Sequence, residues 1–234
     1  ARRLDAEKYG QRASLRILLS HYYLEDREAL AREAAAAPAG TVPPEISRWL
    51  GLRSAQDGDF EAAARHLTSL ADSGHADAEA LVTLAESRNA LGQNAEALAV
   101  AEVYLASATE PAARARGFLA VAEARRGLGE FDPAAEAVNQ ALLLQPEGRL
   151  NAAGRMVSGE IEFSRGDFDA AARAFMSVAL LYDDPAITPR ALLRASDSYR
   201  RARNDSEADK AFNELRERFP DYNLPGTTGE DRSS

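Results

Sequence analysis

The chain has 234 residues and a formal net charge of −9 at pH 7, with a sequence pI near 5.0. Nucleic acids and anionic membranes are bound through concentrated positive charge, so this composition argues against both as partners. The chain has no cysteine, which excludes a disulfide framework, a thiolate metal site and a cysteine nucleophile. No segment approaches the roughly 18 consecutive apolar residues of a spanning helix, so no membrane span is predicted.

The N-terminal part of the chain predicts a pair of helices. Residues 12–38, RASLRILLSHYYLEDREALAREAAAAP, have the pattern of a helix, a turn and a second helix. The segment that follows, AGTVPPE at 39–45, has the glycine and prolines of a connector. We interpret residues 1–44 as a degenerate N-terminal capping hairpin.

A regular spacing of glycines organises the rest of the chain. Gly58, Gly92, Gly129 and Gly166 are separated by 34, 37 and 37 residues, and a further step of 37 reaches Arg203. One period before Gly58 lies Leu24, inside the N-terminal hairpin. A fixed period of this size is typical of stacked supersecondary units. We therefore interpret residues 45–223 as five repeats with these residues as turn markers.

Each repeat predicts two helices and no strand. Apolar residues recur at helical spacing before the markers, as in LVTLAESRNAL and GFLAVAEARRGL, and after them, as in EAAARHLTSLA and PAAEAVNQALLL. The predicted fold class is therefore all-α, built from helical hairpins.

The turn residues support the hairpin interpretation. Gly166 suits the left-handed end of a first helix, and Asp167 or Asp169 suits the N-cap of the second. In the third repeat, Asp132 followed by Pro133 predicts an N-cap and a proline at the first helical position. An aromatic residue near three of these turns is expected to pack between the two helices: Phe60, Phe131 and Phe168.

Small residues recur on both helices of each repeat. We expect them to face one another, because two helices joined by a short turn approach closely only through small side chains. The second helices contribute Ala63, Ala97, Ala134, Ala171 and Ala208, and the first helices contribute Gly51, Ala85, Ala122, Gly159 and Ser196.

These motifs resemble the tetratricopeptide repeat (TPR), a helical hairpin of about 34 residues. The third repeat, LAVAEARRGLGEFDPAAEAVNQALLLQP, has most of the family's small and apolar signature. The ending AFNELRERFPDYN is similar to the last repeat of bacterial envelope members, such as the TolA-binding coordinator of the Tol–Pal system. The resemblance implies a right-handed α-α superhelical solenoid and a setting in the bacterial periplasm or cell envelope, with the cytoplasm as the alternative.

A register of polar residues in the first helices supplies the candidate site. Six residues before the markers stand Glu86, Glu123, Glu160 and Asp197, and three before stand Asn89, Arg126, Phe163 and Arg200; Met156 and Arg201 complete the set. The resemblance implies that these positions face a concave groove that binds a segment of another protein. In family members that clamp carboxylates, Lys or Arg stands four positions before an Asn. Here the matching positions hold Val82, Leu119 and Met156, which disfavours a clamp.

A row of acids favours a partner segment that bears Lys, Arg or a free amine. The alternative is that the acids pair within their own helices, Glu123 with Arg126 and Asp197 with Arg200 and Arg201. Likewise, Phe163 and Met156 either line a pocket for an apolar anchor or pack between neighbouring repeats.

No catalytic motif accompanies this register. The chain lacks HExxH, GxSxG, a Walker loop and a dinucleotide fingerprint, and its three histidines are dispersed. We therefore expect a non-catalytic protein-interaction scaffold with no cofactor and no metal. The alternative is a structural spacer or a self-associating module of a longer protein, and the oligomeric state stays open. The polar tail at 224–234 is expected to be disordered.

Overall fold

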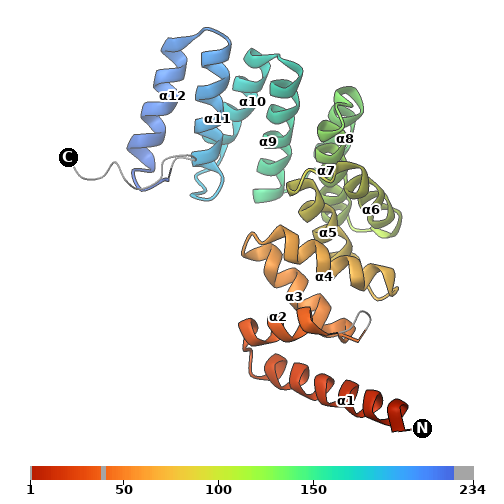
Figure 1. Ribbon diagram of the computed structural model, residues 1–234. Coiled ribbons are helices and arrows are strands. Elements are labelled where there is room, and N and C mark those ends of the chain that lie inside the picture. The colour runs from red at the N-terminus through yellow and green to blue at the C-terminus, as the bar shows by residue number, and fades with distance from the viewer. Residues whose placement is uncertain (1, 38–40, 224–234) are drawn as a thin grey trace, which may run out of the picture. The chain divides into compact units, whose positions relative to one another are not determined.

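The computed structural model of the chain describes residues 2–37 and 41–223 (Figure 1). Within this part of the chain every regular element is a helix, which confirms the predicted all-α fold. None of the described helices combines the length and the apolar character needed to cross a membrane. The tail at 224–234, predicted to be disordered, lies outside the described residues.

The helices fall into two compact units, Ala1–Thr109 and Glu110–Ser234, called here the first and second units. The first unit contains α1 (Arg2–Tyr23), α2 (Arg27–Ala36), α3 (Pro44–Gln56), α4 (Phe60–Asp72), α5 (Ala78–Ala90) and α6 (Asn94–Ser107). The second contains α7 (Pro111–Gly127), α8 (Phe131–Leu143), α9 (Gly148–Arg165), α10 (Phe168–Leu181), α11 (Thr188–Arg201) and α12 (Asp205–Arg218). Odd-numbered helices are the first helices of the hairpins and even-numbered helices are the second.

The turn markers all lie where the spacing predicted. Each marker has a positive φ, from 72° at Gly92 to 89° at Gly166, and Arg203 also adopts this conformation with a φ of 60°. The residue after each marker donates its backbone N–H to the carbonyl five positions earlier, as from Asp167 to Glu162 at 3.0 Å. This pattern is the Schellman motif, which satisfies free carbonyls at the end of a helix.

The N-terminal hairpin has the same turn, one residue later than extrapolated. The positive φ of 54° belongs to Glu25 and not to Leu24. The following residue, Asp26, donates to the carbonyl of His21 at 3.0 Å and caps α2 by accepting the N–H of Ala29. The α1–α2 pair is thus built like the hairpins that follow it.

The predicted N-caps are right in the fourth repeat and wrong in the third. Asp167 accepts the N–H of Ala170 at 2.9 Å, whereas Asp169 lies in the first turn of α10. In the third repeat α8 begins at Phe131, so Asp132 and Pro133 lie inside the helix and Glu130 holds the N-cap position. Helix α8 begins at its aromatic residue, as α4 and α10 do, although the Asp-Pro pair is typical of a helix start.

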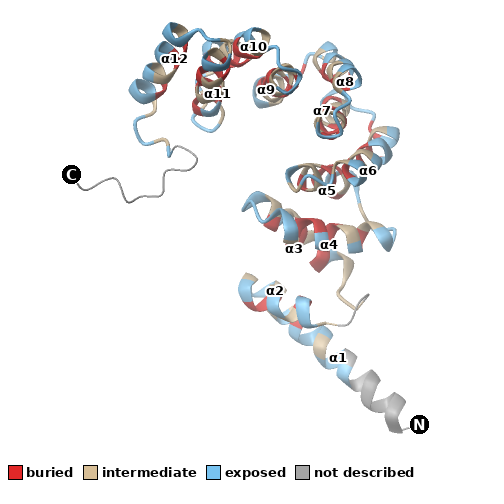
Figure 2. Ribbon diagram, turned by 45° about the horizontal axis from the view of Figure 1, so that its top comes forward, coloured by how far each residue is buried: buried red, intermediate tan, exposed pale blue. Residues whose placement is uncertain are grey.

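The aromatic residues near the turns are not core residues. Phe60 is 37% exposed, and Phe131 and Phe168 are partly exposed. The core instead comes from the sides of the helices that face each other, both within a hairpin and between neighbouring hairpins, and Figure 2 shows buried segments in red on α9, α10 and α11. One cluster joins Met156 of α9, Phe175 of α10 and Ala195 of α11.

The recurrent small residues are buried in every repeat, but two of them face large side chains. A Cβ atom on Gly159 would lie 2.5 Å from Cε1 of Phe175, and a Cβ on Gly51 would lie 2.5 Å from the side chain of Leu67. In the fifth repeat the hydroxyl of Ser196 donates to the backbone carbonyl of Ala208 at 2.9 Å. A small residue on the first helix therefore creates room for a large residue on the second, one turn beyond the recurrent alanine of the repeat.

His66 makes the stability of the first unit depend on pH. Burial, helped by the charge of Arg65, lowers the pKa of His66 from 6.5 to about 4. The unfolded chain therefore binds this proton below pH 6.5, while the folded chain does not until about pH 4. The stability that neutral His66 contributes is complete above pH 6.5 and is lost as the pH falls toward 4.

We expect the free energy of unfolding to fall by about 2 kcal/mol more in the wild type than in His66→Leu between neutral pH and pH 4.5. Trp49 is the sole tryptophan and lies in the first unit, so its fluorescence during urea denaturation reports the relevant transition. Identical pH dependence in the two proteins would contradict the prediction.

Candidate functional site

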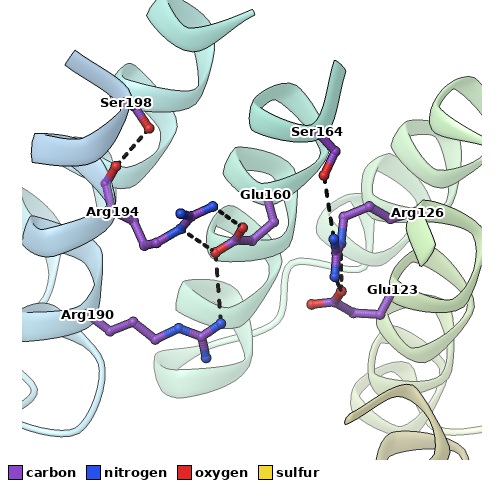
Figure 3. A network of polar contacts seen from close by, with 7 residues as sticks. All are labelled: Glu123, Arg126, Glu160, Ser164, Arg190, Arg194 and Ser198. Atoms are coloured by element: carbon purple, nitrogen blue, oxygen red, sulfur yellow. Dashed lines mark hydrogen bonds and ion pairs between the residues drawn. The ribbon is translucent and has the colours of Figure 1, made fainter. Parts of the chain in front are cut away.

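A polar cluster in the second unit joins α9 to α11, the first helices of consecutive hairpins (Figure 3). Arg194 donates from Nε to Oε1 of Glu160 at 2.8 Å and from Nη2 to Oε2 at 2.5 Å. Nη2 of Arg190 lies 3.8 Å from Oε1 of the same carboxylate. The geometry of the Arg194 contact is the two-bond arrangement in which arginine recognises a carboxylate most strongly.

Both members of this pair are largely shielded from water. The side chain of Glu160 is 13% exposed and that of Arg194 is 23% exposed. A carboxylate shielded to this degree needs a partner, because the lost hydration is otherwise uncompensated. Glu160 therefore connects two hairpins and is neutralised within the chain; it is not a free acid that awaits a basic partner.

An aromatic pair, Phe163 and Phe168, lies beside Arg194 and Arg201. The guanidinium carbon of Arg194 is 4.1 Å from the ring centroid of Phe163, and that of Arg201 is 5.1 Å away. Phe168 meets Phe163 edge to face at 5.3 Å between centroids. Cations attract the faces of such rings, so Phe163 serves as a platform for two arginines from α11.

The acid of the third repeat is paired within its own helix. Nε of Arg126 donates to Oε2 of Glu123 at 2.9 Å, three residues away on α7. Nη1 of Arg126 also reaches Oγ of Ser164 on α9 at 3.5 Å. For Glu123 the intrahelical alternative is therefore the correct one.

The acid of the fifth repeat is different. Asp197 is partly buried, and among the described residues no cation lies within ion-pair distance of its carboxylate; the predicted pairing with Arg200 and Arg201 does not form. Arg200 is exposed and its guanidinium lies 5.7 Å from the ring of Phe212. Arg201 is likewise exposed, near the rings of Phe163 and Phe168.

The remaining predicted residues do not join this cluster. Met156 is 7% exposed and belongs to the core with Phe175, so the packing alternative holds and no pocket for an anchor is present there. Glu86 and Asn89 lie on α5 of the first unit, partly buried, and both interact with other groups of the chain.

Sequence reasoning missed Arg190 and Arg194. Both lie on α11, where positions 190, 194, 197 and 201 fall on one face of the helix because helical neighbours recur every three or four residues. Arg194 also follows Glu160 by 34 residues, one repeat length. A search for opposite charges one repeat apart would have found the pair.

Comparison with known proteins now places the fold. Residues 190–222, which cover most of α11 and all of α12, match the family model of the tetratricopeptide repeat. The whole fold resembles a thermophilic TPR protein of Thermus thermophilus, at 20% identity and a TM-score of 0.61, over 76% of this chain and 93% of that one. The chain has a TPR fold. The predicted all-α stack of TPR-type hairpins is thereby confirmed.

Further structures match the TPR fold at low identity. A TPR protein from Parabacteroides merdae matches at 15% identity and a TM-score of 0.63, over 88% of this chain and 78% of that one. The Rap protein, solved in complex with Competence and Sporulation Factor, matches at 17% identity and a TM-score of 0.68, over 82% of this chain and 58% of that one. No curated protein matches the sequence.

Charge is divided between the two helices of the TPR hairpins in the second unit. The first helices α7, α9 and α11 contain four, three and four arginines but only one, two and one acidic residues. The second helices α8, α10 and α12 contain eight acidic residues and four basic ones. The first helices are thus strongly positive in a chain whose net charge is −9.

A cavity of about 480 Å³ in the first unit has an arginine-rich lining around Trp49, but its charges are compensated. Arg48 donates to Asp77 at 2.7 Å and to Glu79 at 2.9 Å. Burial acts to raise the pKa of Asp77, but the backbone N–H of Ala80 and the Arg48 guanidinium outweigh it and lower that pKa. The aspartate therefore stays ionised in this pair.

A second cavity, of about 550 Å³, lies in the second unit where α12 ends, and is lined mainly by prolines and aromatic residues. Among the described residues, no group of three or more histidine, aspartate or glutamate side chains could hold a metal ion. The candidate site that the charges and aromatic rings support best is therefore the surface shared by α9 and α11, called here the α9–α11 face. It consists of Glu160, Phe163, Arg190, Arg194, Asp197 and Arg201.

Proposed function

We propose that the chain is a non-catalytic scaffold that binds a segment of another protein on the first helices of its TPR hairpins. The observation that carries this proposal is the α9–α11 face, where Arg201 is exposed near the partly buried Phe163 and Arg190 is exposed near Glu160. Arginine and aromatic residues are enriched at protein interfaces because they combine contact area with directional hydrogen bonding.

The comparison with Rap supports a binding role. Rap shares the TPR fold and was solved in complex with Competence and Sporulation Factor. By analogy, a TPR array of this kind can present a surface to a partner.

The setting that we propose is a bacterial envelope or export assembly, with the cytoplasm as the alternative. The support for it is the similarity of the ending AFNELRERFPDYN to the last repeat of envelope TPR proteins. Subcellular fractionation of the source cells with an antibody against the chain tests this setting, and recovery in the cytoplasmic fraction alone would refute it.

Position-dependent photo-crosslinking tests the binding face. A photoreactive phenylalanine analogue replaces Ser164, which is exposed on the first helix α9, or Asn139, which is exposed on the second helix α8. In extracts of the source cells we expect a crosslinked product of defined mass from position 164 and none from position 139.

The masses of the products separate the competing functions. A product from position 139 alone would move the binding face to the second helices and overturn the proposal. A product with twice the mass of the chain would show self-association instead, which is the alternative function. Absence of any product at either position would also count against a scaffold with a partner on α9.

A further inference from the structure

We propose that the α9–α11 face binds an acidic segment of the partner, with carboxylates held by Arg190 and Arg201. This inference rests on the proposed scaffold function and adds the chemistry of the partner. It reverses the expectation from the sequence, in which a row of acids favoured a basic segment.

The local charges favour an anion. Glu160 and Arg194 neutralise each other through two hydrogen bonds, which leaves Arg190 and Arg201 against the single carboxylate of Asp197 on this face of α11. Arg190 is 63% exposed, and its distance of 3.8 Å from Glu160 is longer than a hydrogen bond. The face therefore has an excess of accessible positive charge.

The guanidinium of Arg201 is accessible to a ligand. It lies near the rings of Phe163 and Phe168, at 5.1 and 5.7 Å from their centroids, and the residue is exposed. Because a guanidinium has several N–H donors in one plane, a carboxylate can approach Arg201 from the solvent side and accept two hydrogen bonds.

The charge of the surrounding helices acts in the same direction. The first helices of the second unit have eleven arginines and four acidic residues, so an approaching acidic segment is attracted by more than its immediate contacts. The second helices α8 and α12, which have a net negative charge, oppose non-productive binding on their side of the hairpins.

A protein segment fits better than a nucleic acid. Both are anionic, but a nucleic acid carries charge along its whole length and would meet the field of a chain with net charge −9. A short acidic segment confines its charge to the positive face. Arg190 and Arg201 are eleven positions apart on α11, about 16 Å along the axis at about 1.5 Å per residue. An extended segment with carboxylates about five residues apart spans that distance.

Fluorescence anisotropy with labelled deca-glutamate on the full chain tests the inference. Ten extended residues span about 33 Å and can reach both arginines in any register. The test variant is Arg190→Gln with Arg201→Gln. The matched control is Arg173→Gln with Arg216→Gln, which removes two exposed arginines from the second helices α10 and α12 and changes the net charge equally. Labelled deca-lysine and a ten-nucleotide oligothymidylate are the competing probes.

We expect deca-glutamate to bind at low ionic strength and the test variant to weaken it by about fivefold or more, with less than twofold change in the control. Equal weakening by both variants, absence of deca-glutamate binding, or tighter binding of deca-lysine or of the oligothymidylate would overturn the inference. A crosslink from Ser164 together with any of these results would retain the scaffold function and refute only the acidic partner. Conversely, deca-glutamate binding without any crosslink would retain the anion site and refute the scaffold function.

Discussion

Replacing Phe175 with alanine is expected to lower the free energy of unfolding of the second unit by about 3–5 kcal/mol. Phe175 lies on α10 with 0% of its surface exposed and joins the core cluster that spans α9, α10 and α11. Removal of the ring leaves a cavity between three helices, and the backbone of a stack of hairpins relaxes little to fill it. Among the described residues of the second unit, no other fully buried side chain is as large.

Gly159 provides the complementary substitution. A Cβ at this position would lie 2.5 Å from Cε1 of Phe175, closer than packed atoms tolerate. Gly159→Ala alone should therefore destabilise the second unit by about 1–3 kcal/mol. Combining it with Phe175→Leu, which withdraws the ring, should cost less than the sum of the two single changes, because the substitutions compensate each other.

Hydrogen–deuterium exchange of α9 and α10 measures both effects, since it reports the opening free energy of chosen helices rather than of the whole chain. The control is Gly10→Ala, because a Cβ on Gly10 has no neighbour within 4 Å. That substitution should leave the exchange of α9 and α10 unchanged. Additive losses of stability for Gly159→Ala and Phe175→Leu would show that the ring of Phe175 is not the reason why position 159 holds a glycine.

The turns could be predicted from the sequence because their chemistry is local. A left-handed residue followed by a capping side chain needs only neighbours within one turn, and Gly166 with Asp167 supplies both. The prediction from local chemistry was wrong in the third repeat, where the sequence offers two possible starts for the second helix. Asp132 and Pro133 predicted a helix start, but α8 begins at Phe131, at the same place in the repeat as α10 at Phe168.

The partners of the small residues could not be predicted in the same way. The spacing identified Gly51 and Gly159 as places of close approach, but what approaches them depends on how one helix is rotated against the other. The sequence pattern suggested an alanine, whereas Leu67 and Phe175 fill the space. Contacts across a hairpin depend on the packing register, which periodicity within one helix does not specify.

In the candidate site, too, the contacts between helices could not be predicted from periodicity within one helix. The positions of Glu123, Glu160 and Asp197 followed from the repeat, but their electrostatic states differ: Glu123 pairs along its own helix and Glu160 pairs across hairpins. The partner of Glu160 becomes evident only when α11 packs beside α9. The sign of the charge available to a ligand was therefore set by tertiary contacts and not by the row of acids.

Breaking the contact between Glu160 and Arg194 is expected to destabilise the second unit by about 2–3 kcal/mol, for Glu160→Met or for Arg194→Met. Glu160→Met leaves Arg194 without its carboxylate at 23% exposure, and Arg194→Met leaves Glu160, at 13% exposure, with only the longer 3.8 Å contact to Arg190. The loss is smaller than for a fully buried pair because some hydration remains. Glu123→Met is the matched control, since Glu123 pairs with Arg126 three residues away and both are about 30% exposed, at 29% and 31%. Its cost should be below about 1 kcal/mol.

The double variant with methionine at both positions separates pairing from packing. If the two charges stabilise each other, the double variant should lose less than the sum of the single variants, with a coupling of about 1–3 kcal/mol. Methionine keeps much of the aliphatic stem of each residue, so the comparison isolates the charged groups. Hydrogen–deuterium exchange of α9 and α11 gives the three free energies. Additive losses would mean that Arg194 stabilises α11 mainly through its stacking on Phe163, whose ring centroid is 4.1 Å away. In that case the neutrality of Glu160, on which the excess positive charge of the α9–α11 face depends, would no longer hold.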